Sequence, residues 1–256
     1  MCYDNKARPP ITPIAGGAES TREVTLKAAD GTTFRAFAAR AANPSGAGIV
    51  ILPDIRGLHH FYEELAVRFA EHGIDAVAFD YFGRTAGVAP RSDEFEWQPH
   101  VAATRADTLN HDVAAAVAYL RSAEGGAPRS VFTVGFCFGG SLSWQQAAAG
   151  LNLAGAIGFY GRPTGPTRDG SPPPVDTAGN YTCPILGLMG GADQGIPQSS
   201  IDAFDHALTA AHVPHELVVY PGAPHSFFDR HQAAHADASA DAWSRIQAFI
   251  AKNSEK

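Results

Sequence analysis

Apolar and polar residues follow two different periods along this chain, and these periods predict its secondary structure. Continuous apolar runs rich in branched residues, typical of buried strands, lie at residues 48–52, 74–79, 131–136, 153–160, 183–189 and 215–220. Between them, apolar residues recur at helical spacing over residues 60–72, 104–123, 197–211 and 232–252. Strands that alternate with helices favour an α/β fold with a mostly parallel central sheet of about seven to eight strands and helices on both faces.

The N-terminal part of the chain has a different pattern. Residues 22–28 and 33–40 alternate between apolar and polar, and Asp30-Gly31 lies between them, which predicts a β-hairpin. Residues 1–20 are polar and contain prolines, so we expect an N-terminal arm on the surface, followed by a single domain over residues 21–256.

One connection in the second half of the chain is unusually long. Residues 161–180 form the segment richest in proline and glycine, including three consecutive prolines at 172–174. Loops of this length inside a compact domain are usually functional or mobile. We therefore expect this loop, together with Tyr160 before it, to shape the rim of a binding pocket.

Charge and cysteine content narrow the class of partner. The 256 residues can bury a sizeable core, and the formal net charge of −7 argues against nucleic acid or an anionic membrane as the main partner. Cys2, Cys137 and Cys183 make no CxxC pair, and an odd count is typical of the reducing cytoplasm. No apolar stretch has the form of a signal peptide or a membrane span. We expect a cytoplasmic monomer or small homo-oligomer.

The apolar run at 131–136 leads into the most informative stretch of the sequence. Gly135-Phe136-Cys137-Phe138-Gly139 has the pattern of the nucleophile elbow of α/β-hydrolases, with cysteine in place of serine. Such an elbow needs small residues two places before and two places after the nucleophile. The helix that follows directs its first amides and its dipole at the thiol, which favours the thiolate. The alternative is that Cys137 is a buried core cysteine beside a structural turn.

Four predicted strands end in residues that can carry chemistry: Asp54, Cys137, Asp193 and His225. In an open α/β sheet, ligands bind beyond the carboxyl ends of the strands, so these residues are expected to converge. The order nucleophile, acid, histidine is that of an α/β-hydrolase triad. His225 is then the base for the thiol, and Asp193 orients the imidazole. The alternative for Asp193 is a cap of the helix that begins near Pro197.

With these residues in view, the sequence resembles the dienelactone hydrolase family, whose members have an α/β-hydrolase fold and a cysteine nucleophile. The resemblance rests on five blocks in family order, at residues 53–57, 80–84, 135–140, 189–193 and 222–227. It implies that Cys137, Asp193 and His225 form the catalytic triad. It also implies that the backbone amides of Phe138 and Ile55 form the oxyanion hole.

The resemblance assigns further residues and also shows departures. Asp54 stands where the family usually has a glutamate that pairs with an arginine and gates the thiol. Arg84 matches a family arginine that binds the substrate carboxylate, although a surface salt bridge is the alternative. A second arginine is expected at position 229, where this chain has Asp229 followed by Arg230. Tyr81, Phe82 and Phe227 are candidates for the aromatic wall of the pocket.

Together these features predict a hydrolase of small activated esters or lactones, with a substrate that can be anionic. A general carboxylesterase without dienelactone activity is one alternative. Another is a non-catalytic thiol sensor on a hydrolase scaffold, which needs Cys137 alone. His231 and His235 have the spacing of a metal pair on a helix, but no third ligand accompanies them, so we expect neither a metal site nor a cofactor.

Overall fold

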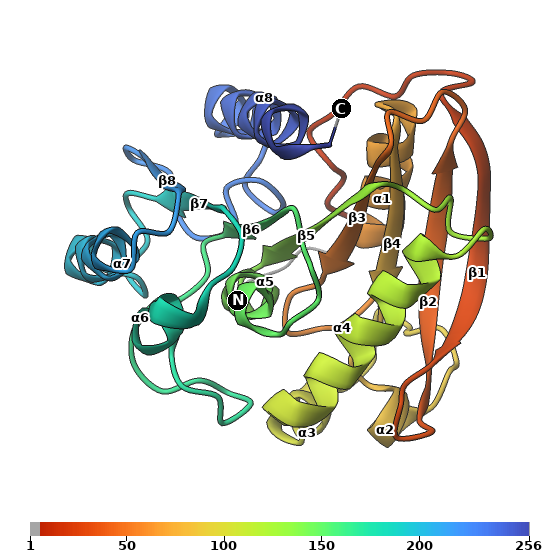
Figure 1. The fold of residues 1–256 in the computed structure, drawn as a ribbon, viewed down its shortest axis with the longest axis horizontal. Coiled ribbons are helices and arrows are strands. Elements are labelled where there is room, and N and C mark those ends of the chain that lie inside the picture. Colours follow the sequence, from red (N-terminus) through yellow and green to blue (C-terminus); the bar gives the residue numbers. More distant parts are fainter. Residues whose placement is uncertain (1–5, 256) are drawn as a thin grey trace.

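The computed structural model describes residues 6–255, so Cys2 and the start of the predicted arm lie outside it. Eight strands form one sheet in the order β1-β2-β4-β3-β5-β6-β7-β8 (Figure 1). Their bounds are Ala18–Lys27 (β1), Thr33–Ala41 (β2), Ala47–Leu52 (β3), Ile74–Phe79 (β4), Ser130–Phe136 (β5), Gly155–Phe159 (β6), Ile185–Gly190 (β7) and His215–Tyr220 (β8). The β1-β2 and β2-β4 pairs are antiparallel and the other five are parallel, which confirms the predicted α/β-hydrolase architecture.

Helices cover both faces of this sheet. Their bounds are His60–Glu71 (α1), Gly83–Ala86 (α2), Trp97–Ala102 (α3), Ala106–Arg121 (α4), Phe138–Gln145 (α5), Pro174–Thr177 (α6), Gln198–Ala210 (α7) and Ala236–Asn253 (α8), with 3₁₀ turns at Gln146–Ala148 (η1) and Ala178–Asn180 (η2). Figure 1 shows α4 in front of the sheet and α1 behind it. None of the helices within residues 6–255 is long and apolar enough to cross a membrane.

Apolar spacing decides which face each long helix buries. Phe69 of α1 packs against Trp243 of α8 with ring centroids 4.9 Å apart, so these two helices share one face of the sheet. On the other face, Trp144 of α5 packs against Phe204 of α7 at 5.0 Å. Trp144 is fully buried and its indole N–H donates to the carbonyl of Leu186, as expected for a core tryptophan.

Two elements begin four residues away from their predicted starts, whereas the other predicted boundaries agree to within two residues. β1 begins at Ala18, inside the predicted N-terminal arm. The prediction missed this start because most side chains of this edge strand are exposed, so its sequence carries little apolar signal. The last helix begins at Ala236 and not at Gln232. The chain before it is folded into successive turns, in which the N–H of His231 donates to the carbonyl of Ser226.

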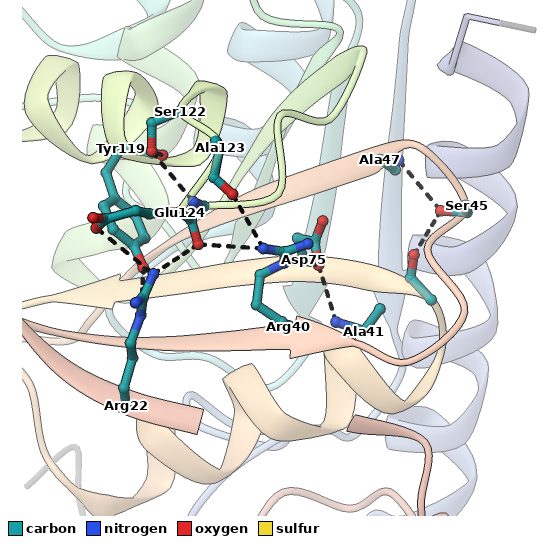
Figure 2. A network of polar contacts seen from close by, with 12 residues as sticks. Arg22, Arg40, Ala41, Ser45, Ala47, Asp75, Tyr119, Ser122, Ala123 and Glu124 are labelled. Carbon is teal, nitrogen blue, oxygen red and sulfur yellow. Dashed lines mark hydrogen bonds and ion pairs between the residues drawn. The ribbon is translucent and has the colours of Figure 1, made fainter. Parts of the chain in front are cut away.

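A polar network ties the antiparallel edge of the sheet to the end of α4 (Figure 2). Arg40 and the N–H of Ala41 both donate to Asp75, at 3.1 and 2.9 Å. Arg22 donates to the hydroxyl of Tyr119 at 2.9 Å and to the carbonyl of Glu124 at 2.8 Å. Asp75 lies near the start of β4, at the amino ends of the parallel strands. The network therefore stabilises the side of the sheet opposite to the strand ends that carry Cys137 and His225.

Candidate active site

Cys137 occupies a strained turn between β5 and α5. Its backbone has φ 56° and ψ −112°, a conformation that costs a non-glycine residue about 1–3 kcal/mol. The turn closes so tightly that a Cβ on Gly135 would lie 1.8 Å from the carbonyl oxygen of Gly139. A Cβ on Gly139 would lie 2.2 Å from the carbonyl oxygen of Leu52. These contacts explain why the elbow pattern has glycine on both sides of the cysteine.

The surroundings of the Cys137 thiol differ from those of a core cysteine. Cys137 is half-buried and lines a cavity, and α5 begins at the next residue, so the positive end of this helix lies beside the sulfur. Cys183, by contrast, is buried at the start of the β7 region, where burial raises the pKa of its thiol to about 12. The sequence alternative of a core cysteine therefore describes Cys183 and not Cys137.

His225 and Asp193 form a close pair at the ends of β8 and β7. Nδ1 of His225 lies 2.6 Å from Oδ2 of Asp193, and Oδ1 of Asp193 accepts the N–H of Gly195 at 2.8 Å. The ring of His225 packs against Tyr160 with centroids 4.8 Å apart. No side chain caps α7 in the described part of the chain, so the carboxylate of Asp193 contacts the imidazole of His225 and is not a helix cap.

The three residues meet at one cavity of about 570 Å³ at the carboxyl ends of the strands. Cys137, Asp193 and His225 all line it, although they are up to 88 positions apart in the sequence. Further walls come from α5, through Phe138, Ser141, Leu142 and Gln145, and from the loop at residues 162–169. Three of the four strand-end residues predicted to converge therefore line one cavity, whereas Asp54 is buried and is not part of the lining. The proline- and glycine-rich loop forms another part of the cavity wall.

The sequence matches the dienelactone hydrolase family over residues 34–254. The chain belongs to this family. It is 32% identical over 238 residues to a "Putative carboxymethylenebutenolidase" of Salmonella typhimurium, which covers 90% of this chain and 86% of that relative. A similarly named protein of Escherichia coli is 31% identical over 253 residues, covering 93% of this chain and 92% of the relative.

Solved structures agree with this assignment. A structure titled "Putative Dienelactone Hydrolase" from Klebsiella pneumoniae superposes with a TM-score of 0.78 at 26% identity, covering 91% of this chain and 99% of that one. Membership of the dienelactone hydrolase family makes the protein a hydrolase of the carboxylic ester type.

The two backbone amides expected to form the family's oxyanion hole belong to adjacent segments. Phe138 is the first residue of α5, and the first N–H groups of a helix have no partner within the helix. Ile55 lies in the loop after β3, and a Cβ on Gly139 would lie 2.4 Å from the carbonyl oxygen of Pro53 in the same loop. The elbow and this loop are therefore in direct backbone contact.

Asp54 belongs to this loop, and its side chain is buried in a network of its own. Its carboxylate accepts the backbone N–H of Arg56 at 2.8 Å and the guanidinium of Arg56 at 3.0 Å, and His59 lies 3.6 Å away. Burial alone raises the pKa of Asp54, but the adjacent His59 imidazole and the charge of Arg56 outweigh it and hold the pKa well below its ordinary value. In this chain the arginine that pairs with Asp54 is thus Arg56, from the same loop.

The position of Arg84 corrects an expectation from the sequence. Its guanidinium donates to the buried carboxylate of Asp112 on α4 at 2.5 Å and to Asp30 in the hairpin turn at 2.6 Å. Arg84 is not among the residues that line the cavity of the described chain. Arg84 therefore makes the salt bridge that was the alternative for it in the sequence, with Asp112 bound at Nη1 and Asp30 at Nη2.

The predicted aromatic wall is also placed differently. Tyr81, Phe82 and Phe227 are buried, and none of them is part of the cavity lining described above. Tyr81 instead packs against Phe138 with centroids 5.4 Å apart and donates its hydroxyl to the carbonyl of Pro53 at 2.7 Å. Phe138 and Tyr160 provide the aromatic rings that line the cavity, and Tyr81 and Phe227 pack against these two rings from behind.

Arg230 is a predicted substrate ligand that does line the cavity. Its neighbour Asp229, which stands at the expected arginine position, is buried. Burial and the nearby charge of Asp54 raise the pKa of Asp229 to about 7. Sequence reasoning missed two cavity arginines, Arg162 and Arg168. Their only signal was their place in the proline- and glycine-rich loop.

Proposed function

We propose that the protein hydrolyses small activated esters or lactones of the carboxymethylenebutenolide type through a Cys137-His225-Asp193 triad. The observation that carries this proposal is Cys137 on a strained elbow, in one cavity with the His225-Asp193 pair. The names of the relatives, carboxymethylenebutenolidase and dienelactone hydrolase, support the substrate class. The reducing cytoplasm expected from the cysteine pattern keeps such a thiol active.

The reaction begins with proton transfer from the thiol of Cys137 to Nε2 of His225. Asp193 holds Nδ1 of the imidazole and stabilises the imidazolium that forms. The thiolate sulfur then bonds to the carbonyl carbon, and the carbonyl π electrons move to oxygen. The N–H groups of Phe138 and Ile55 donate to this oxyanion, and removal of one such donor typically costs about 3–4 kcal/mol of barrier.

Collapse of the tetrahedral intermediate breaks the bond between the carbonyl carbon and the ester oxygen. The leaving oxygen takes the proton from His225, and the acyl group remains on Cys137 as a thioester. Water then gives a proton to His225 and attacks the thioester carbonyl, and the second intermediate releases the acid and the thiol. A cysteine suits an enol-lactone because its leaving group needs little protonation.

Asp54 supports this chemistry through the loop that carries Ile55. Its carboxylate accepts the N–H of Arg56 and pairs with the Arg56 guanidinium, so both ends of the short turn around Ile55 are fixed. We assign Asp54 the task of positioning the Ile55 amide. Direct gating of the thiol, the role of the longer glutamate in the family, is the alternative for this residue.

Two other functions remain as alternatives. A general carboxylesterase would use the same triad without cleaving dienelactone. The departures from the family pattern at Asp54 and Asp229 favour this alternative. A thiol sensor would need Cys137 but neither His225 nor Asp193, whereas their 2.6 Å contact favours an enzyme.

Steady-state kinetics on cis-dienelactone and on p-nitrophenyl acetate separate these functions. We expect the wild type to hydrolyse both, and Cys137→Ala and His225→Ala each to lose turnover by a factor of 1000 or more, on the order of that seen when a triad member is removed. Hydrolysis of the acetate alone would identify the general esterase. Full activity of His225→Ala would show that His225 is not the base for the thiol, and would refute the triad.

A further inference from the structure

Three arginine side chains line the cavity that contains Cys137, in a protein whose net charge is −7. Arg162 and Arg168 belong to the loop after β6, and Arg230 follows β8. The cavity of about 570 Å³ falls in the size range that takes a drug-sized ligand. A concentration of cations in one cleft of an acidic protein creates a local positive field that attracts anions.

The acidic side chains of the same cavity are already occupied. Asp193 binds His225 and the N–H of Gly195. Asp169 is buried, and its Oδ1 accepts the N–H and the hydroxyl of Ser171, at 3.1 and 2.7 Å. The cavity therefore has three guanidinium groups and two carboxylates among its lining side chains, and both carboxylates are hydrogen-bonded to groups other than these arginines.

Arg162 and Arg168 differ from most arginines of this protein. Within residues 6–255 neither of them has a carboxylate at ion-pair distance, whereas Arg35, Arg56 and Arg84 all do. Both are exposed at the mouth of the cavity. Arg230 donates to Nε2 of His231 through Nε and Nη2, at 3.0 and 2.7 Å, so its partner is a neutral ring and not an acid.

The loop that carries the two exposed arginines is held against α5. The hydroxyl of Ser141 donates to the carbonyl of Arg162 at 3.0 Å. Gln145 donates to the hydroxyl of Ser171 at 2.8 Å and to the carbonyl of Pro172 at 2.7 Å. Two side chains of the helix that starts at Cys137 thus fix both ends of the loop, so the arginines have a defined place relative to the thiol.

We propose that Arg162 and Arg168, together with Arg230, form an anion subsite that selects esters with an ionised carboxylate apart from the scissile carbonyl. This inference rests on the proposed ester hydrolysis at Cys137. It assigns specificity to the loop after β6 and not to Arg84, the arginine that sequence reasoning had favoured. The two exposed guanidinium groups attract the carboxylate at the mouth, and the half-buried Arg230 receives it inside the cavity.

Matched substrates test the subsite. p-Nitrophenyl hemiesters of succinic and glutaric acid are compared with neutral p-nitrophenyl esters of equal length, for the wild type and for Arg162→Gln, Arg168→Gln and the double variant. We expect the wild type to have the higher kcat/KM for the anionic ester. Each single variant should lower the anionic-to-neutral ratio about threefold to fivefold, as expected for a partly exposed ion pair, and the double variant about tenfold or more. Arg129→Gln, which removes an exposed arginine outside the cavity lining, should leave the ratio unchanged.

Two results with these substrates would contradict the anion subsite. A wild type that prefers the neutral ester, or a double variant with an unchanged ratio, would overturn the subsite while leaving the proposed hydrolysis intact. For Cys137→Ser protein, we expect glutarate to raise the melting temperature, and to do so less at 0.5 M than at 0.02 M NaCl because salt screens exposed charges. Absence of this shift would also contradict the subsite, whether or not the enzyme cleaves any ester.

Discussion

Replacement of Asp229 by asparagine should make the protein more stable at alkaline pH. Asp229 is buried, its Oδ1 accepts the N–H of Arg230, and the charged groups around it are Asp54, Arg56 and His225. Burial in the first place, and repulsion from Asp54 in the second, raise its pKa to about 7 from the ordinary 3.8. Asparagine keeps the shape and the acceptor oxygen but carries no charge.

The sign of the effect follows from proton binding. Between pH 3.8 and pH 7 the folded protein keeps a proton on Asp229 that the unfolded chain has released, so folding stability falls as the pH rises through this window. Below pH 3.8 the penalty is absent, and above pH 7 it is complete. The two pKa values imply that the free energy of unfolding loses about 2–3 kcal/mol between pH 5 and pH 8 through this carboxyl group alone.

Urea unfolding at pH 5 and pH 8, followed by the fluorescence of the buried Trp144 and Trp243, measures this difference. We expect the advantage of Asp229→Asn over the wild type to grow by about 2–3 kcal/mol from pH 5 to pH 8. Asp237→Asn, an exposed aspartate in the first turn of α8, is the matched control and should show less than about 0.5 kcal/mol of such change. Equal pH profiles for the wild type and Asp229→Asn would show that Asp229 does not titrate near pH 7 in the folded protein.

Two substitutions test the elbow and the corrected arginine. Gly135→Ala places a Cβ 1.8 Å from the carbonyl oxygen of Gly139, so the turn must open, and we expect kcat/KM for p-nitrophenyl acetate to fall about 100-fold or more. Gly179→Ala, where no atom lies within 4 Å of the new Cβ, is its control, and equal activity of the two variants would contradict the elbow geometry. Arg84→Ala leaves the buried Asp112 without its partner, so we expect about 3 kcal/mol less stability by urea unfolding. The ratio of cis-dienelactone turnover to p-nitrophenyl acetate turnover should equal that of the wild type. A selective loss of lactone turnover would show that Arg84 contributes to substrate binding.

Much of the site could be predicted because topology places it. Parallel strands end at the same edge of the sheet, so residues that directly follow β5, β7 and β8 must lie near one another. The tight glycine contacts of the elbow are local, and the five-residue pattern around Cys137 is enough to predict them. For these residues the order along the chain already carries the spatial arrangement.

The residues that were misplaced depend on contacts between distant segments. Arg84 is held by Asp30 and Asp112, and no local pattern indicates that α4 and the hairpin turn bring these acids together. Arg162 and Arg168 lie in an irregular loop without periodicity, so only its composition pointed to a function. The early start of β1 was missed because an exposed edge strand has no apolar alternation to detect.

In the proposed reaction, Cys137 carries the acyl group during hydrolysis. Intact-mass spectrometry and peptide mapping of enzyme quenched within milliseconds of mixing with an activated ester measure this directly. We predict one acyl group per chain, on the peptide that contains Cys137, released by hydroxylamine and absent in Cys137→Ala. An acyl group on another residue, or full turnover by Cys137→Ala, would show that Cys137 is not the nucleophile.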